Sequence, residues 1–200
     1  MEAIILASGS PRRSEILTRM GVAFEKWAAD VDEQCALGAR EAVAELSARK
    51  ARAGAAQFPG RLVLAADTLV ALNNRPLGKP KDEEDACRML ERLSGREHQV
   101  YTGVCVATPQ GELLCGVEQS DVCFRTLTAQ EIRAYVATGE PMDKAGAYAL
   151  QGGAGKWVTQ VSGSRSNVIG LPWELTQQLL RRAGLAVDAG NEMDGMIAWR

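Results

Sequence analysis

The residue whose setting most strongly predicts chemistry is an aspartate within an apolar run. Asp67 interrupts the segment Val63–Val70, which is otherwise apolar apart from Thr68. A charged carboxylate that is buried in a strand without a partner loses much of its hydration energy. Such a residue therefore binds a cation, pairs with an arginine or lysine, or works as an acid or base. The alternative is structural: an aspartate at a strand end that accepts hydrogen bonds from backbone amides.

A second candidate site is the turn Ser8–Arg13, which leads from an apolar strand into a helix. Ser10 is a good N-cap residue, and Pro11 suits the first helical position because its missing N–H costs nothing there. Backbone N–H groups at a helix N-terminus favour an anion such as a phosphate. Arg12 and Arg13 oppose the helix dipole in this first turn. A bound anion would remove that conflict; the alternative is a solvated pair of surface arginines.

Further charged residues could join either site. Asp32 and Glu33 add two carboxylates that could complete a hard-metal site with Asp67, because Mg²⁺ takes a few oxygen ligands beside substrate phosphates. The segment Lys79–Lys81 follows a turn and could bring cations to the same place. Lys50 lies in an alanine-rich helical segment, where the residue alone indicates a solvated lysine.

Two glycine-rich or serine-rich stretches are less informative. Asp143–Gly153 contains glycines that permit tight turns or a close backbone approach to a ligand. Ser162–Asn167 offers several small hydrogen-bond donors before the last helix. Either stretch could be a plain loop.

Cysteine and histidine usage excludes several classes of site. The five cysteines are odd in number, and no two have CxxC spacing, which disfavours a disulfide framework and a zinc site. We expect free cysteines and a cytoplasmic protein. The single histidine, His98, has only Glu97 as an acidic neighbour in sequence, so we expect it to be structural or at the surface.

The elements that must position these residues alternate between strand and helix patterns. Strands are expected at about residues 3–7, 22–28, 61–72, 99–108 and 112–125, and helices at about 11–20, 40–57, 82–93, 128–139 and 171–183. A capping box, Thr128 with Glu131, opens the fourth helix. The alternation predicts an α/β fold, and a hairpin turn at 109–111 makes the sheet mixed.

Composition limits the remaining possibilities. The chain has 200 residues, of which 46% are hydrophobic and 24% charged, with a net charge of −2. These values are typical of one globular domain, or two small lobes that share a core. The charge disfavours a large nucleic-acid interface, and no apolar run is long enough to cross a membrane. Residues 186–200 show no clear period and are expected to be a tail.

Taken together, these segments resemble the Maf family of nucleoside triphosphate pyrophosphatases. The matching motifs fall in family order between about residues 3 and 183. They are Leu6–Arg13 (LASGSPRR), Val31–Glu33 (VDE), Ala48–Ala51 (ARKA), Ala66–Thr68 (ADT), Gly78–Pro80 (GKP), Asp143–Tyr148 (DKAGAY), Leu150–Gly152 (LQG) and Ser166–Pro172 (SNVIGLP). The tail after Leu185 is not explained by the resemblance.

The resemblance implies both a fold and a reaction. The fold is α/β, an elongated mixed β-sheet with helices in two lobes around a central cleft (Maf/ITPase-like), formed by residues 1–185 as one domain. The reaction is hydrolysis between the α and β phosphates of a nucleoside triphosphate, which gives a nucleoside monophosphate and pyrophosphate. A divalent cation, Mg²⁺ or Mn²⁺, is implied as cofactor, and a homodimer as the assembly.

The resemblance also implies roles for individual residues. Asp67 looks like the proton acceptor that activates water, and Glu33 would hold the metal, with Asp67 as a second ligand. Basic and hydroxyl side chains would bind the triphosphate and stabilise charge in the transition state; these are Ser8, Arg13, Lys50 and Lys79.

Three further positions bear on the choice of base. Arg12, Thr68 and Gln151 are similar to the branch of the family that acts on dTTP and UTP. A neutral glutamine amide can donate to O4 of a pyrimidine and accept from its N3–H. Two alternatives stay open: a preference for 7-methyl-GTP, whose branch has Trp, Gln and Glu at these places, and a nucleotide-binding regulator of cell division without turnover.

Overall fold

The computed structural model describes residues 2–187 and contains one seven-stranded sheet. The strands are β1 (Ile4–Leu6), β2 (Phe24–Lys26), β3 (Val63–Leu72), β4 (Arg75–Leu77), β5 (Glu97–Ala107), β6 (Leu113–Phe124) and β7 (Val158–Ser162). The α-helices are α1 (Pro11–Arg19), α2 (Ala39–Gln57), α3 (Glu83–Leu93), α4 (Ala129–Val136), α5 (Arg165–Ile169) and α6 (Trp173–Arg182). Short 3₁₀ turns span Glu140–Asp143, Ala145–Ala147 and Gly155–Trp157.

The sheet is mixed, as the sequence predicts. Its strand order is β2-β1-β3-β5-β6-β7, with β4 paired to β3. The first three strands are parallel, because α1 and α2 return the chain to the same end of the sheet. From β3 onward each pair is antiparallel. The expected fold class, an elongated mixed sheet in an α/β protein, is therefore confirmed.

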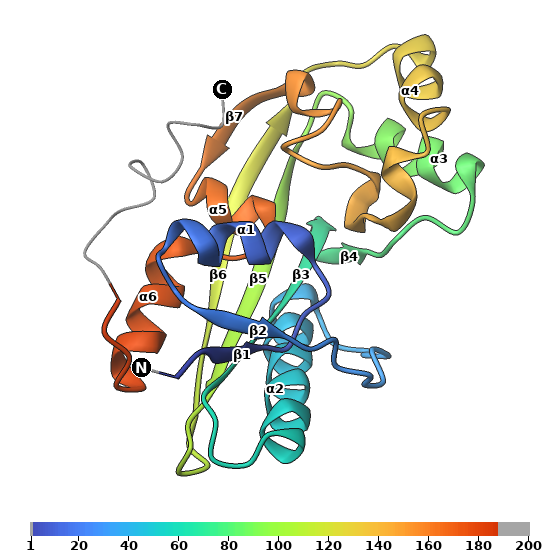
Figure 1. Cartoon of the computed structure of the whole chain (residues 1–200). Coiled ribbons are helices and arrows are strands. Elements are labelled where there is room, and N and C mark those ends of the chain that lie inside the picture. The colour runs from blue at the N-terminus through green and yellow to red at the C-terminus, as the bar shows by residue number, and fades with distance from the viewer. Residues whose placement is uncertain (1, 188–200) are drawn as a thin grey trace.

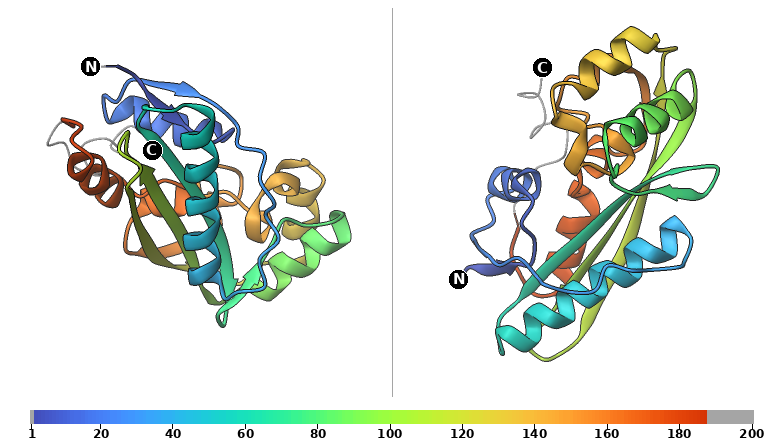
Figure 2. Two further views of the ribbon diagram at one scale, coloured as in Figure 1. Left: turned by 90° about the horizontal axis from the view of Figure 1, so that it is seen from below. Right: turned by 90° about the vertical axis from the view of Figure 1, so that its right-hand side faces the viewer.

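Helices cover both faces of the parallel part of the sheet. The alternation of β3 sends Val63 and Ala65 to the face covered by α2, and Leu64 and Ala66 to the face covered by α1 and α6. Figure 2 shows α2 on one side of the strands and α1, α5 and α6 on the other. Because both faces are buried there, β1 and residues 63–66 of β3 are apolar throughout rather than alternating.

A second lobe forms at the far ends of the long strands β3, β5 and β6. Figure 1 shows α3 and α4 there, at the opposite end from β1 and β2. Its core is aromatic: Phe124, Tyr148 and Trp157 are buried together, and Tyr135 of α4 stacks edge-on against Trp157. The lobe packs on the same sheet, so the long strands connect both halves of the molecule.

One edge of β3 is left without a strand partner, and this gap defines the site. On this edge β1 pairs with residues 63 and 64 of β3, and β4 pairs with residues 70–72. Within residues 2–187, no strand pairs with the intervening stretch on that edge. Asp67 and Thr68 lie in this stretch, and their other edge pairs with Gly103 and Thr102 of β5.

The structure differs from the predicted elements in several places. β3 runs unbroken through Asp67 and Thr68. A tight turn at Asn73 and Asn74, which adopt left-handed φ values of 51° and 59°, ends β3. It is followed by β4, an edge strand that tolerates Pro76. α5 begins in the serine-rich stretch 162–167 and the 3₁₀ turn Ala145–Ala147 lies in the stretch 143–153, both of which the sequence leaves as possible loops. β7 and the other two 3₁₀ turns lie mostly where no helix or strand is expected. Most of the expected tail, 188–200, lies outside the described residues.

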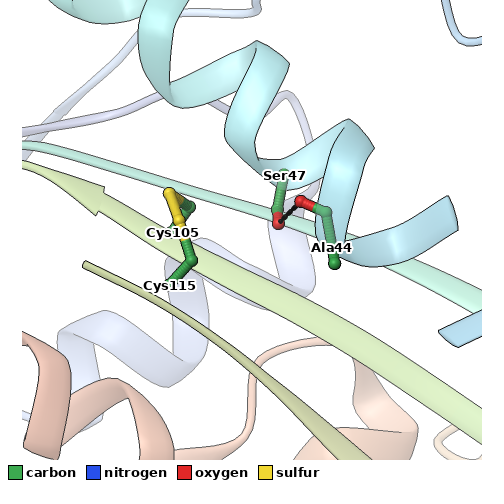
Figure 3. Close-up of a disulfide and its surroundings, with 4 residues drawn as sticks. All are labelled: Ala44, Ser47, Cys105 and Cys115. Atoms are coloured by element: carbon green, nitrogen blue, oxygen red, sulfur yellow. Dashed lines mark hydrogen bonds between the residues drawn. A yellow bond between two sulfur atoms is a disulfide. The ribbon is translucent and has the colours of Figure 1, made fainter. Parts of the chain in front are cut away.

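The expectation that all the cysteines are free is wrong for one pair. Cys105 of β5 and Cys115 of β6 are directly opposite in the antiparallel register and form a disulfide. Figure 3 shows the bond beside α2, near Ala44 and Ser47. Cys35, Cys87 and Cys123 are free. Sequence spacing could not show the pairing, because it depends on the hairpin register.

Across residues 2–187 the helices are either too short or too polar to span a membrane.

Candidate active site

A cleft of about 630 Å³ opens along the free edge of β3. Its walls come from the turn before α1, the loop before α2, the loop after β4 and the segment 143–151. The structure brings together at this cleft every residue to which the family resemblance gives a role: Ser8, Arg12, Arg13, Glu33, Lys50, Asp67, Lys79, Thr68 and Gln151. Asp32 and Lys81, the other charged candidates, do not line it.

A lysine that bridges two carboxylates is the centre of the site. Lys50 Nζ lies 2.6 Å from Asp67 Oδ1 and 2.7 Å from Glu33 Oε1. Lys50 and Asp67 are each only 8% exposed, so their mutual attraction is weakly screened by solvent. Glu33 is more exposed, and its hydrogen bond to Lys50 holds its pKa below the ordinary value. Asp67 therefore has the basic partner that its apolar strand predicts.

The close approach of α2 to the sheet places Lys50 beside Asp67. Asp67 pairs with Gly103 of β5, and a Cβ on Gly103 would collide with the backbone of Val43 in α2. Glycine at this position lets the helix backbone lie directly against the strand. The alanine-rich inner face of α2 also lets the helix pack close to the sheet. The Lys50 side chain can therefore extend from the helix to the Asp67 carboxylate.

A second basic residue of α2, Arg49, holds the loop that carries Glu33. Arg49 Nη1 donates to the carbonyl oxygens of Asp32 and Gln34, at 3.1 and 3.2 Å. Glu45 orients Arg49 through a 2.8 Å ion pair. The residues on both sides of Glu33 are thus fixed to the helix that presents Lys50. The Asp32 side chain caps the amide of Gln34 instead of joining the site.

The guanidinium of Arg13 is held by three acceptors at the turn before α1. Arg13 donates to Ser8 Oγ at 2.9 Å, to Thr68 Oγ1 at 3.1 Å and to the carbonyl of Gly170 at 2.9 Å. Burial lowers the pKa of Arg13, and nearby Asp67 opposes that shift. Arg13 is therefore a fixed positive charge in the cleft, which suits a phosphate oxygen.

Behind Arg13 lies a chain of buried polar residues. The hydroxyl groups of Thr68 and Thr102 are 3.0 Å apart, and Thr102 donates to the carbonyl of Asn167. The Asn167 amide in turn donates to the carbonyl of Val100 and to Ser120 Oγ. Thr68 thus faces Arg13 and the buried network. This is a different setting from the base contact that the family resemblance implies for it.

The opposite end of the cleft is more open. Lys79 and Gln151 are exposed at its rim, and Arg12 is half-buried. Tyr148 forms the wall behind them and hydrogen bonds to His98 at 2.8 Å. His98 is fully buried, and burial lowers its pKa to about 4. The histidine is structural, as the sequence predicts, and not at the surface.

Some residues of the site were not singled out from the sequence. Arg49 and Glu140 hydrogen bond to the backbone beside Glu33 and Gln151. Thr102 contacts the hydroxyl of Thr68. Asn167 does lie in a motif shared with the Maf family, although the motif alone indicates no role for it. Lys144 also lines the cleft, with its ammonium on the carbonyl of Glu140.

The residues present fit a divalent cation. Two carboxylates, Glu33 and Asp67, converge on the Lys50 ammonium, so a cation already lies where their charges meet. Within residues 2–187 no group of three or more metal-binding side chains occurs. Mg²⁺ commonly takes one or two carboxylates and completes its shell with substrate phosphates and water. A two-carboxylate site of this kind needs the triphosphate to complete it.

Comparisons with known proteins agree with this geometry. The family model described as Maf-like protein matches residues 3–183. A protein named dTTP/UTP pyrophosphatase from Anaeromyxobacter dehalogenans (strain 2CP-C) is 51% identical over 186 residues, which cover 90% of this chain and 94% of that protein. One of the same name from Escherichia coli O157:H7 is 46% identical over 198 residues, covering 98% of this chain and 100% of the relative.

A solved structure shows the same fold at low sequence identity. The Staphylococcus aureus Ham1 protein superposes with a TM-score of 0.53 at 18% identity, covering 90% of this chain and 99% of that one. From the family model and the relatives together, the chain belongs to the Maf-like protein family.

Proposed function

We propose that this protein hydrolyses dTTP and UTP to the nucleoside monophosphate and pyrophosphate. The observation that carries the proposal is the Lys50 bridge between Asp67 and Glu33, set beside Arg13 in one cleft. Relatives at 46–52% identity over most of the chain are named for this activity. Modified pyrimidine nucleotides are further candidate substrates, in a house-cleaning role.

Asp67 is the group that can accept a proton from water. Its carboxylate takes one proton as the water oxygen forms a bond to the α-phosphorus. The bond from that phosphorus to the bridging oxygen breaks, and pyrophosphate leaves with the electron pair. Lys50 fixes one oxygen of Asp67 by its 2.6 Å contact, which leaves the carboxylate oriented for this transfer. Asp67 then returns its proton to solvent.

The basic residues stabilise the charge that builds on the phosphates. Arg13 is held rigidly by three acceptors, so it needs little reorganisation when negative charge develops. Lys79, exposed at the rim, and Ser8, at the turn before α1, are the further phosphate ligands in this proposal. Positioning and electrostatic stabilisation supply most of the catalysis in phosphoryl transfer.

Glu33 and Asp67 would hold the divalent cation, Mg²⁺ or Mn²⁺. When bound, such an ion neutralises phosphate charge and polarises the phosphorus–oxygen bond. Glu33 is suited to this role because its pKa is depressed, which keeps the carboxylate charged well into the acid range.

A substrate panel tests the proposed function. Purified protein is incubated with Mg²⁺ or Mn²⁺ and each of dTTP, UTP, CTP, GTP, ATP and 7-methyl-GTP, and released pyrophosphate is measured. We expect most turnover with dTTP and UTP. Preference for 7-methyl-GTP would reassign the substrate, and binding without turnover would support the regulator. The absence of both binding and turnover would remove the proposal altogether.

The wider setting follows from the same proposal. Residues 1–185 would form one domain with two lobes, which matches the single sheet that connects them. We place the protein in the cytoplasm, where nucleoside triphosphates are made and used, and propose a homodimer. Light scattering of the purified chain tests the dimer directly.

A further inference from the structure

The segment that carries Gln151 is a turn with little structure of its own. It runs from Ala149 to Gly155 between two 3₁₀ turns, and it includes three glycines. Its internal bonds are Gly152 N–H to the carbonyl of Ala149 and Gly155 N–H to the carbonyl of Gly152. A turn of this composition needs contacts from outside to hold one conformation. Contacts from outside the turn hold the backbone next to Gln151.

A carboxylate from the 3₁₀ turn Glu140–Asp143 of the same lobe lies against this turn. Both oxygens of Glu140 accept the backbone N–H of Gly153, at 3.2 and 3.1 Å. A Cβ on Gly152 would overlap the same carboxylate, so the chain can pass this close only because it has glycine there. Glu140 thus fixes the turn two residues after Gln151.

A buried tyrosine completes the arrangement. Tyr135 of α4 donates its hydroxyl to Glu140 Oε1 at 2.9 Å. Its ring stacks edge-on against Trp157 with centroids 4.9 Å apart. The packed phenol therefore orients the Glu140 carboxylate that accepts the N–H of Gly153.

We propose that Tyr135 and Glu140 form a clamp that positions Gln151 for recognition of the base. The clamp holds the backbone at Gly153 through the Glu140 carboxylate, which Tyr135 orients, and leaves the Gln151 side chain exposed at the rim of the cleft. Neither clamp residue lines the cleft itself. Both are positioning residues, and the inference rests on the proposed function.

Three variants test the clamp. Glu140→Ala removes both acceptors, Tyr135→Phe removes only the hydroxyl, and Glu140→Gln keeps one acceptor oxygen. With UTP we expect Glu140→Ala and Tyr135→Phe to raise KM about tenfold, with kcat within about threefold of wild type, because each loses hydrogen bonds that order the base site. Glu140→Gln should recover most of the loss.

Product inhibition separates the clamp from a general loss of structure. The inhibition constant for UMP should rise about tenfold in Glu140→Ala and Tyr135→Phe, whereas that for pyrophosphate should not change, because pyrophosphate binds only at the phosphate end. Glu131→Ala is the matched control: Glu131 caps the start of α4 and pairs with Arg125, far from Gln151 in the chain. It should lower Tm and leave both inhibition constants unchanged.

The outcomes are distinct. If wild type hydrolyses UTP but the clamp variants keep its KM and the UMP inhibition constant, the clamp is wrong and the proposed function stands. Equal weakening of UMP and pyrophosphate would also overturn it. If wild type fails to hydrolyse any pyrimidine triphosphate, the proposed function fails first.

Discussion

The two ends of the cleft are built in different ways. At the phosphate end, Lys50, Asp67 and Thr68 come from the middle of a long helix and a long strand, and buried hydrogen bonds lie behind them. At the base end, Gln151 comes from a turn and is exposed. In the proposed mechanism, regular elements fix the groups that must not move during the reaction. Gln151, the residue proposed to choose the base, lies on a turn, where a few contacts can change its position.

The largest effect should come from the acid–base group at the phosphate end. Asp67→Asn keeps the shape of the side chain and removes the proton acceptor, so we expect kcat to fall about a thousandfold. Circular dichroism and Tm should stay close to those of wild type, since Lys50 keeps Glu33 as a partner. A loss of less than about tenfold in pyrophosphate release would show that another group accepts the proton.

Acid should disturb the base end first. The buried His98 has a pKa of about 4 in the folded protein, against 6.5 for an exposed histidine. The unfolded chain therefore binds the extra proton first, and the free energy of unfolding should fall by about 3 kcal/mol as pH drops from about 6.5 to 4. Glu33, whose pKa is depressed, keeps its charge over much of this range.

Urea unfolding of wild type and His98→Gln between pH 4 and 7 checks this expectation. The glutamine can still accept from Tyr148 but does not titrate, so its stability should depend less on pH. Equal pH dependence in the two proteins would contradict the assignment of the acid sensitivity to His98.

A smaller effect should follow from loosening the support of Arg13. Thr102→Val removes the hydroxyl that contacts Thr68 and the carbonyl of Asn167, and keeps the volume. We expect kcat/KM to fall about fivefold, because about 1 kcal/mol of hydrogen bonding is lost behind a phosphate ligand.

Thr176→Val is the matched control for Thr102. Thr176 is also fully buried, and its hydroxyl has no hydrogen-bond partner among the described residues. Removing that hydroxyl should leave kcat/KM unchanged and should not lower Tm. If the two variants lose activity equally, the network behind Arg13 has no special part in the site.

The smallest effect on activity is expected away from both ends. Cys105 and Cys115 do not line the cleft, so Cys115→Ser should change kcat/KM by less than about twofold. Losing the cross-link should still lower the free energy of unfolding by about 2 kcal/mol, because the unfolded chain gains freedom. Wild type with and without a reductant gives the same test, and a tenfold change in kcat/KM in either case would tie the disulfide to the site.

The phosphate end was largely predictable from the sequence, and the base end was not. A charged residue in an apolar strand requires a partner, and this requirement alone identifies Asp67 as a candidate site residue. Local sequence signals also predicted the bounds of α2 to within one residue and the capping box of α4. These features depend on neighbours in the chain, which a sequence pattern records.

Other features depend on register and on contacts across the fold. The pairing of Cys105 with Cys115, and the strand β4 that contains Pro76, follow from how strands align. The bonds from Glu140 to Gly153 join a 3₁₀ turn to a distant turn in the same lobe. Contacts between single residues leave no periodic pattern, so the sequence does not predict them.

Hydrolysis of dTTP in ¹⁸O-labelled water tests the attack on the α-phosphorus most directly. With Asp67 beside the α-phosphate, we expect one labelled oxygen in dTMP and none in pyrophosphate, measured by mass spectrometry of the products after a single turnover. Label found in pyrophosphate would mean that water attacks the β-phosphorus, and would contradict the placement of the triphosphate against Asp67.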